Sequence, residues 1–411
     1  MSSCARGTDP RGTEVTGHLA RLGAATAVAL TGALILQLPA GSALPAPPAR
    51  HVPGTGVVAL DWGDLDRTPA AAAGDYLVME PWEYDRIPAY RAANPGLKIL
   101  MYKDVSATVD RPHETGLYPT GVSYADADRH HPEWFLTDAA GTRLEWSDYA
   151  GLFPMDVGSR TYQDAWAGGV LGELRAHDWD GVVLDDTLTY LSHPTVDELV
   201  STQIPDDAAQ YAATQSFLSR VGPRLKAAGY LAISNVTVEW DTWDTVLPAW
   251  SRYVSGWEDE YFVKWGLDTG TRFTGADWEW KMQLAAWCAD RRLPLVAVTY
   301  SSVTDRDAQT YHRATWLLTW NGATGASVFV PAELSASHWQ ARAATDLGRP
   351  SGGRVRQPDG VYRRAYTRGL VVVNPTRGTR VVDLGGSYER LGGRKVTSVR
   401  LPPASAALLR R

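Results

Sequence analysis

Eight short apolar runs recur between residues 56 and 331, and most are separated by helical patterns or turn-rich loops. Apolar runs without polar alternation are typical of strands buried on both faces, as in parallel sheets. Parallel neighbours need crossover connections, which the helical segments supply. Eight such units in about 280 residues predict an α/β fold of the (β/α)8 (TIM) barrel type. The expected strands are 57–61, 76–79, 98–102, 181–185, 231–235, 253–256, 295–300 and 326–330.

A doubly wound open sheet is the alternative for the same alternation of strands and helices. Nucleotide-binding sheets of that kind carry a Gly-rich loop after the first strand, whereas this chain reads Leu60-Asp61-Trp62-Gly63-Asp64 there. From about Gly352 onward, the helical pattern stops and short β-like runs alternate with turns. We therefore expect a catalytic barrel over residues 56–345, followed by a small antiparallel β-sandwich over residues 352–411.

The N-terminal segment has the three parts of a secretory signal. Arginines precede an apolar run over residues 22–38, and small residues follow it. We expect a signal peptide over residues 1–43, a proline-rich linker over residues 44–55, and an extracellular protein without stable membrane insertion. An uncleaved segment would instead keep the protein at the cell surface. Cleavage would leave Cys288 as the only cysteine, so no intramolecular disulfide is expected.

The composition favours a sugar ligand over a nucleic acid. The formal net charge of −6 argues against a nucleic-acid partner, which calls for a basic surface. The chain has 17 tryptophans but only 6 phenylalanines. Tryptophan combines a broad flat face with one hydrogen-bond donor, which suits a cleft for sugar rings, although most of these side chains will fill the core.

Acidic side chains follow several of the expected strands. In residues 180–186 an apolar run ends in Asp185 and Asp186, and the sixth strand is followed by Glu258 and Glu260. Barrel chemistry comes from the carboxyl ends of strands, and glycoside hydrolysis needs two carboxyl groups flanking the bond. We therefore predict Asp185, or Asp186, as nucleophile or base. Glu260, or Glu258, is predicted as the acid, with a solvated loop as the alternative for the two glutamates.

Other polar and aromatic groups near the strand ends are candidates for substrate binding. Asn235 also begins a glycosylation sequon, but its place at a strand end favours a buried amide that holds a substrate hydroxyl. Lys103 suits either an acidic sugar, the neutralisation of a carboxylate, or a structural ion pair. The full candidate set is Asp61, Trp62, Glu80, Trp82, Lys103, Asp156, Asn235, Trp257 and Tyr300.

Three segments resemble parts of hypothetical bacterial glycosyl hydrolases with a (β/α)8 barrel. They are residues 180–186 (DGVVLDD), 153–156 (FPMD) and 255–262 (SGWEDEYF). In those families, an aspartate after the first motif and a glutamate before an aromatic pair are the presumed catalytic acids. The run 369–375 (GLVVVNP) with Leu401-Pro402-Pro403 is similar to the β-domain that follows such barrels. One position departs from the pattern, because Ser255 stands where an acidic residue is expected.

Other site chemistries fit the sequence less well. His130 and His131 are the only histidine pair, and no His-x-x-x-His or Cys-x-x-Cys spacing exists, so we expect neither a metal nor a cofactor. The Gly-x-Ser-x-Gly motif of serine esterases is also absent. A barrel that binds glycans without cleaving them is the remaining alternative to a glycoside hydrolase. The oligomeric state cannot be inferred from the sequence.

Overall fold

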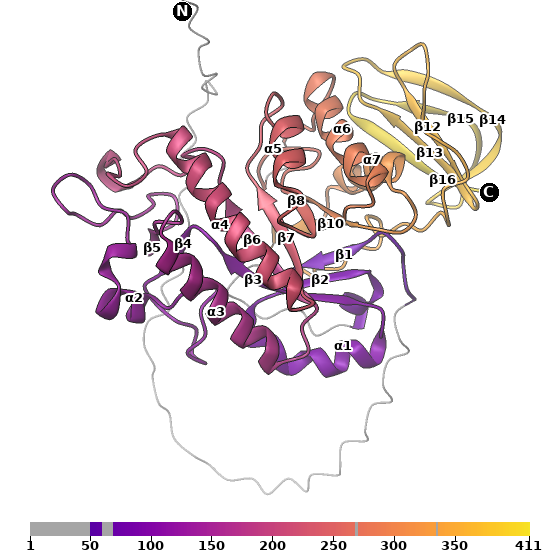
Figure 1. Cartoon of the computed structure of the whole chain (residues 1–411). Coiled ribbons are helices and arrows are strands. Elements are labelled where there is room, and N and C mark those ends of the chain that lie inside the picture. The colour runs from indigo at the N-terminus through magenta and orange to yellow at the C-terminus, as the bar shows by residue number, and fades with distance from the viewer. Residues whose placement is uncertain (1–49, 60–68, 268–269, 334–335) are drawn as a thin grey trace, which may run out of the picture. The chain divides into compact units, whose positions relative to one another are not determined.

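The computed structural model describes residues 50–59, 69–267, 270–333 and 336–411. These residues belong to one compact unit, Pro47–Arg411. Within it, an eight-stranded parallel sheet precedes an antiparallel sheet of six strands (Figure 1). No helix among the described residues is long and apolar enough to cross a membrane. The expected signal peptide, and Asp61 and Trp62, lie outside the described residues.

The eight parallel strands form a nearly closed barrel. Their order is β1-β2-β3-β6-β7-β8-β9-β10, and a parallel bridge between Thr55 and Ser327 joins the first strand's edge to the last. The strands are β1 (Gly56–Val58), β2 (Tyr76–Met79), β3 (Lys98–Asp104), β6 (Gly181–Thr187), β7 (Leu231–Val236), β8 (Gly256–Asp259), β9 (Leu295–Ser301) and β10 (Ala326–Pro331). The predicted barrel is confirmed.

Helices follow most of the strands, as crossover connections require. Two of these helices begin at an aspartate cap: the side chain of Asp206 accepts a hydrogen bond from the backbone of Ala209, and that of Asp305 from the backbone of Ala308. The helices that follow the strands are α1 (Ile87–Ala93), α3 (Arg160–Ala176), α4 (Asp207–Ala227), α5 (Trp243–Trp250), α6 (Ala276–Asp290) and α7 (Arg306–Thr319). Their apolar faces share one buried cluster with the outward side chains of the strands.

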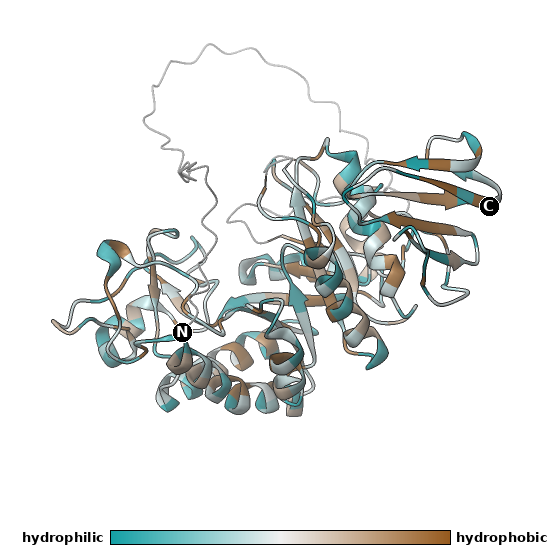
Figure 2. Cartoon of the chain, turned by 90° about the horizontal axis from the view of Figure 1, so that it is seen from above, coloured by the Kyte–Doolittle hydropathy of each residue, from teal (hydrophilic) through white to brown (hydrophobic). Residues whose placement is uncertain are grey.

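The inside of the barrel is filled by alternate residues of the strands. Val183, Ile233 and Val296 belong to a separate interior cluster, whereas their neighbours Val182 and Leu184 pack outward against the helices. This alternation is the period of two that any strand imposes. In Figure 2 the strands are largely brown, and several barrel strands turn teal at the arrowhead, where polar residues end them.

The long connection between β3 and β6 builds a cap beside the barrel. It contains the hairpin of β4 (Ala107–Val109) and β5 (Leu152–Pro154), together with the helix α2 (Tyr124–His130). The first residue of β4 pairs with Pro154, and Met155 donates to the carbonyl of Ser106. The connection is thereby tied to the carboxyl end of β3.

The C-terminal strands form an antiparallel sheet with its own apolar core, as predicted. Its order is β11-β12-β13-β16-β14-β15, and its core includes Val372, Val399 and Leu409. The other face, with Val371 and Tyr366, joins the large cluster that contains α7. The strands are β11 (Val355–Arg356), β12 (Tyr362–Tyr366), β13 (Gly369–Asn374), β14 (Arg380–Arg390), β15 (Lys395–Leu401) and β16 (Ser405–Arg410).

The sixth barrel strand lies further along the chain than expected. The prediction was residues 253–256, but β8 is Gly256–Asp259. All four of its residues are buried, including Glu258 and Asp259. Acids inside a barrel strand are rare, so the apolar pattern pointed to the preceding segment instead.

Arg313 of α7 fixes the start of the barrel. Its side chain is 1% exposed and donates to the carbonyls of Pro53 (3.0 Å), Gly54 (2.5 Å) and Thr345 (3.1 Å). Arg313→Met would leave these buried carbonyls without donors, so we expect a loss of about 3 kcal/mol in the free energy of unfolding, measured in urea. Arg306→Met, at an exposed position of the same helix, should change it by less than about 0.5 kcal/mol. Equal effects of the two substitutions would contradict this role for Arg313.

Candidate active site

The inward side chains of five strands meet at the carboxyl end of the barrel. Each of four strands carries a polar side chain two residues after an apolar residue of the barrel interior, so it also points inward. These side chains are Tyr102 of β3, Asp185 of β6, Asn235 of β7 and Tyr300 of β9. Glu260 comes directly after β8. Because the strands are parallel, these ends lie on one rim, where barrel enzymes bind their substrates.

A cavity of about 200 Å³ opens at this rim. Five carboxyl groups line it, together with two tyrosines and a wall from the β3–β6 connection. The lining residues are Glu80, Tyr102, Asp104, Val109, Pro119, Thr120, Tyr149, Leu152, Asp185, Asp186 and Glu260. None of these described residues is a lysine or an arginine, so the cavity is strongly acidic.

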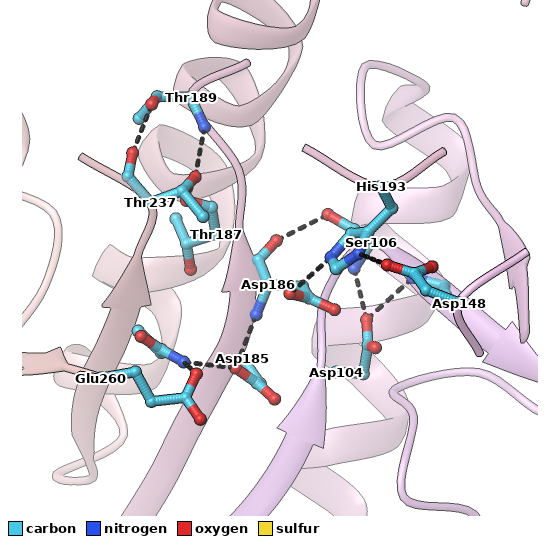
Figure 3. A network of polar contacts seen from close by, with 12 residues as sticks. Asp104, Ser106, Asp148, Asp185, Asp186, Thr187, Thr189, His193, Thr237 and Glu260 are labelled. Atoms are coloured by element: carbon cyan, nitrogen blue, oxygen red, sulfur yellow. Dashed lines mark hydrogen bonds and ion pairs between the residues drawn. The ribbon is translucent and has the colours of Figure 1, made fainter. Parts of the chain in front are cut away.

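The amide of Asn235 joins two of these carboxyl groups. Its Nδ2 donates to Asp185 Oδ1 at 2.7 Å and to Glu260 Oε2 at 2.9 Å. The two accepting oxygens therefore cannot be farther apart than the sum of these distances. Asp185 also accepts from the hydroxyl of Tyr102 (2.5 Å), and Glu260 accepts from that of Tyr300 (2.5 Å). Figure 3 shows Asp185 and Glu260 facing each other from neighbouring parts of the rim.

Burial favours the protonated forms of Asp185 and Glu260. Loss of solvation, and next the charges of Asp186 and Glu260, raise the pKa of Asp185 to about 7. Burial likewise raises the pKa of Glu260, against the hydrogen bonds from Tyr300 and Asn235 that favour its ionised form. Two carboxyl groups this close cannot both ionise easily, so one holds the proton when the other is charged. Such a pair can supply an acid and an anion at the same pH.

Asp186 is held by a histidine from the following loop. His193 Nε2 lies 3.2 Å from Asp186 Oδ1, and its Nδ1 lies 3.0 Å from Asp148 Oδ2 (Figure 3). Both ring nitrogens face carboxylates, and despite the opposing effect of burial these contacts raise the pKa of His193 to about 9. Asp186 has a φ of 48°, an uncommon left-handed conformation that turns its side chain away from the strand's regular path. His193 is therefore an imidazolium that balances the charge of Asp186.

Glu258 lies below the cavity, inside the barrel. It is 1% exposed, and neither of its carboxyl oxygens has a hydrogen-bond partner among the described residues. Burial, together with the charges of Glu260 and Asp185, raises its pKa well above the ordinary range. Glu258 is thus a neutral acid that does not reach the cavity. Between the two predicted glutamates, the geometry favours Glu260.

The structure places the other predicted binding residues in different surroundings. Glu80 lines the cavity, but Lys103 points outward and donates to Glu173 Oε1 at 2.8 Å. Trp257 is fully buried among the helices, and Trp82 stacks on His113 with ring centroids 4.3 Å apart. Asp156 accepts from the backbone of Gly158 in the turn that precedes α3, outside the cavity lining.

Sequence reasoning missed Tyr102, Tyr149 and His193. For Tyr102 a signal existed, since strand alternation from Leu100 places it inward and turns Lys103 outward. Tyr149 and His193 lie on loops, and their approach to Asp186 depends on how those loops fold. The sequence contains no local pattern for such an approach.

A second cavity, of about 260 Å³, includes His193 in its lining. It is lined mainly by apolar side chains, including Trp146, Leu188 and Leu199. It contains no pair of carboxyl groups, so the acid–base chemistry belongs to the first cavity. Within the described part of the chain, no group of three or more His, Cys, Asp or Glu side chains is arranged to hold a metal ion.

A parallel barrel with a coupled carboxyl pair at the carboxyl ends of its strands is the architecture of many glycoside hydrolases. The chain belongs to hypothetical glycosyl hydrolase family 15, whose profile matches residues 91–370. This membership makes the protein a glycoside hydrolase. A comparison with curated proteins gives no match.

Solved structures of glycoside hydrolases are similar in fold. The glycoside hydrolase domain of PelA from Pseudomonas aeruginosa has 18% identity and a TM-score of 0.47, over 69% of this chain and 99% of that one. A family GH13_31 enzyme has 11% identity and a TM-score of 0.51, over 89% and 99%. An Anoxybacillus alpha-amylase has 12% identity and a TM-score of 0.45, over 80% and 78%. At these identities the likeness concerns the fold alone.

The raised pKa of Asp185 predicts a dependence of stability on pH. The ordinary value of 3.8 rises to about 7 in the folded chain, so the folded state prefers the protonated form. Stability from this group is therefore complete below pH 4 and is lost as the pH rises to 7. Asp185→Asn removes this loss, so its unfolding free energy relative to the native sequence should rise by about 3–4 kcal/mol between pH 4 and pH 7.5.

Urea unfolding at several pH values measures this difference. Asp241→Asn, at an exposed loop position, serves as the matched control. A difference between Asp185→Asn and the native chain that stays constant from pH 4 to pH 7.5 would contradict the buried, coupled state of Asp185.

Proposed function

We propose that this protein is an exported glycosidase that cleaves O-glycosidic bonds of a poly- or oligosaccharide, with Asp185 and Glu260 as its carboxyl pair. Family membership supports the reaction class, and the acidic cavity supports the site. Export rests on the signal-like pattern of residues 1–43.

The observation that carries the proposal is the shared amide of Asn235. Its two hydrogen bonds, of 2.7 and 2.9 Å, bring an oxygen of each carboxyl group close to the other. Retaining glycosidases hold their carboxyl groups about 5–5.5 Å apart, and inverting enzymes about 6.5–9.5 Å apart to admit a water. The two hydrogen bonds of Asn235 limit the distance between the carboxyl oxygens of Asp185 and Glu260. This limit supports the shorter separation and hence a retaining reaction.

The number of hydrogen-bond donors around each carboxyl group distinguishes the nucleophile from the acid. Asp185 accepts from Tyr102, Asn235 and its neighbour's backbone N–H at Asp186, whereas Glu260 accepts from two side chains. Donors stabilise the ionised form and oppose the rise in pKa that burial and the charge of Glu260 cause at Asp185. When the pair holds a single proton, the larger donor set therefore favours the anion on Asp185 and the proton on Glu260. Asp185 is therefore proposed as the nucleophile and Glu260 as the acid, as the sequence predicted.

The reaction then takes two displacements. A carboxylate oxygen of Asp185 bonds to the anomeric carbon as the glycosidic C–O bond breaks, and Glu260 transfers its proton to the departing oxygen. Glu260, now ionised, takes a proton from a water whose oxygen attacks the same carbon. The bond to Asp185 breaks, and both carboxyl groups return to their first state.

The charge of the cavity restricts the sugar. The described residues of the lining include five acidic side chains and neither lysine nor arginine, and Lys103 donates to Glu173. An anionic sugar would bring further negative charge close to these carboxyl groups, and the imidazolium of His193 already contacts Asp186. The cavity therefore favours neutral or cationic sugars over acidic ones, which argues against the acidic-sugar interpretation of Lys103.

A glycan-binding barrel without activity is the rival function. Binding alone has no use for two buried carboxyl groups that share one donor and compete for one proton, because ionising them opposes folding. The coupled pair therefore favours the enzyme.

Loss of activity in amide variants tests the proposal. Reducing-sugar release from neutral and amino-sugar polysaccharides should fall at least about 1,000-fold in Asp185→Asn and Glu260→Gln, since each removes one chemical role. Glu258→Gln should keep activity within about tenfold, because the amide resembles the protonated acid already present there. Activity that survives Glu260→Gln but not Glu258→Gln would contradict the assignment. Binding without turnover by the native chain would support the rival function.

A further inference from the structure

The C-terminal domain has a charge opposite to that of the rest of the chain. Residues 352–411 contain 12 arginines and one lysine against three acidic residues, a formal charge of +10, although the whole chain carries −6. Such a difference in charge between two parts of a chain indicates that the basic part binds a partner. Charge of this kind acts through surface potential and does not help the sheet to fold.

Arginines of this domain gather around two neighbouring hollows. One, of about 560 Å³, is lined by Arg50, Arg368, Arg410 and Arg411 with the acid Asp346. The other, of about 420 Å³, is lined by Arg342, Arg390 and Arg394 with the acid Asp307. Both hollows include residues of β16 and of the segment 341–346, and we call their combined lining the arginine surface.

Little of this positive charge is neutralised within the molecule. Among the described residues, Arg368 is the only basic side chain of residues 352–411 in an ion pair, and its partner is Asp346. Glu389 pairs in register with Arg410 and Lys395 and is the nearest further acid on these strands. Arg394, Arg410 and Arg411 are exposed. The surface therefore keeps a net positive charge that is open to a ligand.

The lining also indicates how a ligand would be recognised. The residues of the two hollows include no tryptophan, tyrosine or phenylalanine. Stacking on sugar faces or on nucleic-acid bases needs such rings, and membrane-surface binding uses them as interfacial anchors. Guanidinium groups instead match carboxylate and phosphate groups through paired N–H donors. Recognition here is by negative charge along an extended surface.

We propose that the arginine surface binds an anionic polysaccharide chain. A polysaccharide fits because the domain accompanies a glycoside hydrolase barrel, and two adjoining hollows suit successive charged groups of one polymer. The acidic lining of the barrel cavity disfavours anionic sugars, so we assign this surface to a polymer other than the one that the active site cleaves. The site is independent of the reaction assigned to Asp185 and Glu260.

Binding of the full chain to defined polymers tests the site. The probes are polygalacturonate for carboxylate groups, phosphomannan for phosphate groups, and neutral mannan as the uncharged counterpart. The triple variant Arg394→Gln, Arg410→Gln, Arg411→Gln removes three charges from the arginine surface. Its matched control, Arg354→Gln, Arg356→Gln, Arg377→Gln, removes three charges from exposed positions outside both hollows.

We expect one or both anionic polymers to bind at low salt, neutral mannan not to bind, and affinity to fall steeply as salt is raised. The surface variant should bind at least tenfold more weakly and the control variant less than threefold, with unchanged unfolding midpoints. The tighter polymer identifies the anion. Equal losses in both variants would overturn a localised site. Preferential binding to duplex DNA or to phosphatidylglycerol vesicles would overturn the choice of partner. Activity on short glycans is measured separately and bears only on the catalytic proposal.

Discussion

Side chains of the barrel strands point alternately inward and outward, and the site depends on this period of two. On β6 it sends Val183 and then Asp185 inward, while Leu184 packs against helices. On β7 it places Asn235 above Ile233, and on β9 it places Tyr300 above Val298. A slip of one residue in any of these strands would turn its polar group into the helical layer. The barrel core and the carboxyl pair are therefore products of the same register.

Several acidic side chains close together at the rim lower the stability of the folded state. Hydrogen-bond donors and cations around them reduce this loss. Asn235, Tyr102 and Tyr300 supply donors to the central pair, and the imidazolium of His193 compensates Asp186. Outward acids are treated differently, since Asp259 pairs with Lys281 of α6. Glu258 has neither kind of partner among the described residues and stays neutral. Each acid near the rim thus has a distinct protonation environment, which is the condition for assigning acid and anion to different residues.

The sequence allowed the barrel, the C-terminal sheet and the position of Asp185 at the end of a strand to be predicted because each produces a local pattern. Apolar runs of the right length revealed seven of the barrel strands close to their observed positions. The remaining strand, β8, was predicted too early in the chain because it contains two buried acids. Tryptophan abundance was a weaker guide, since Trp257 and Trp166 fill the core and the described cavity lining contains tyrosines. Contacts between loops produce no periodic pattern in the sequence. His193 and Asp148, for example, are 45 positions apart.

The proposed reaction depends most on Asp185 and Glu260 influencing each other's titration. Carbon-13 NMR titration of the aspartate carboxyl groups, in the native chain and in Glu260→Gln, measures this without any substrate. Because the charge of Glu260 helps to raise the pKa of Asp185, the pKa of Asp185 should fall clearly in the variant. An unchanged pKa of Asp185 would show that the two groups titrate independently, and would contradict the shared site.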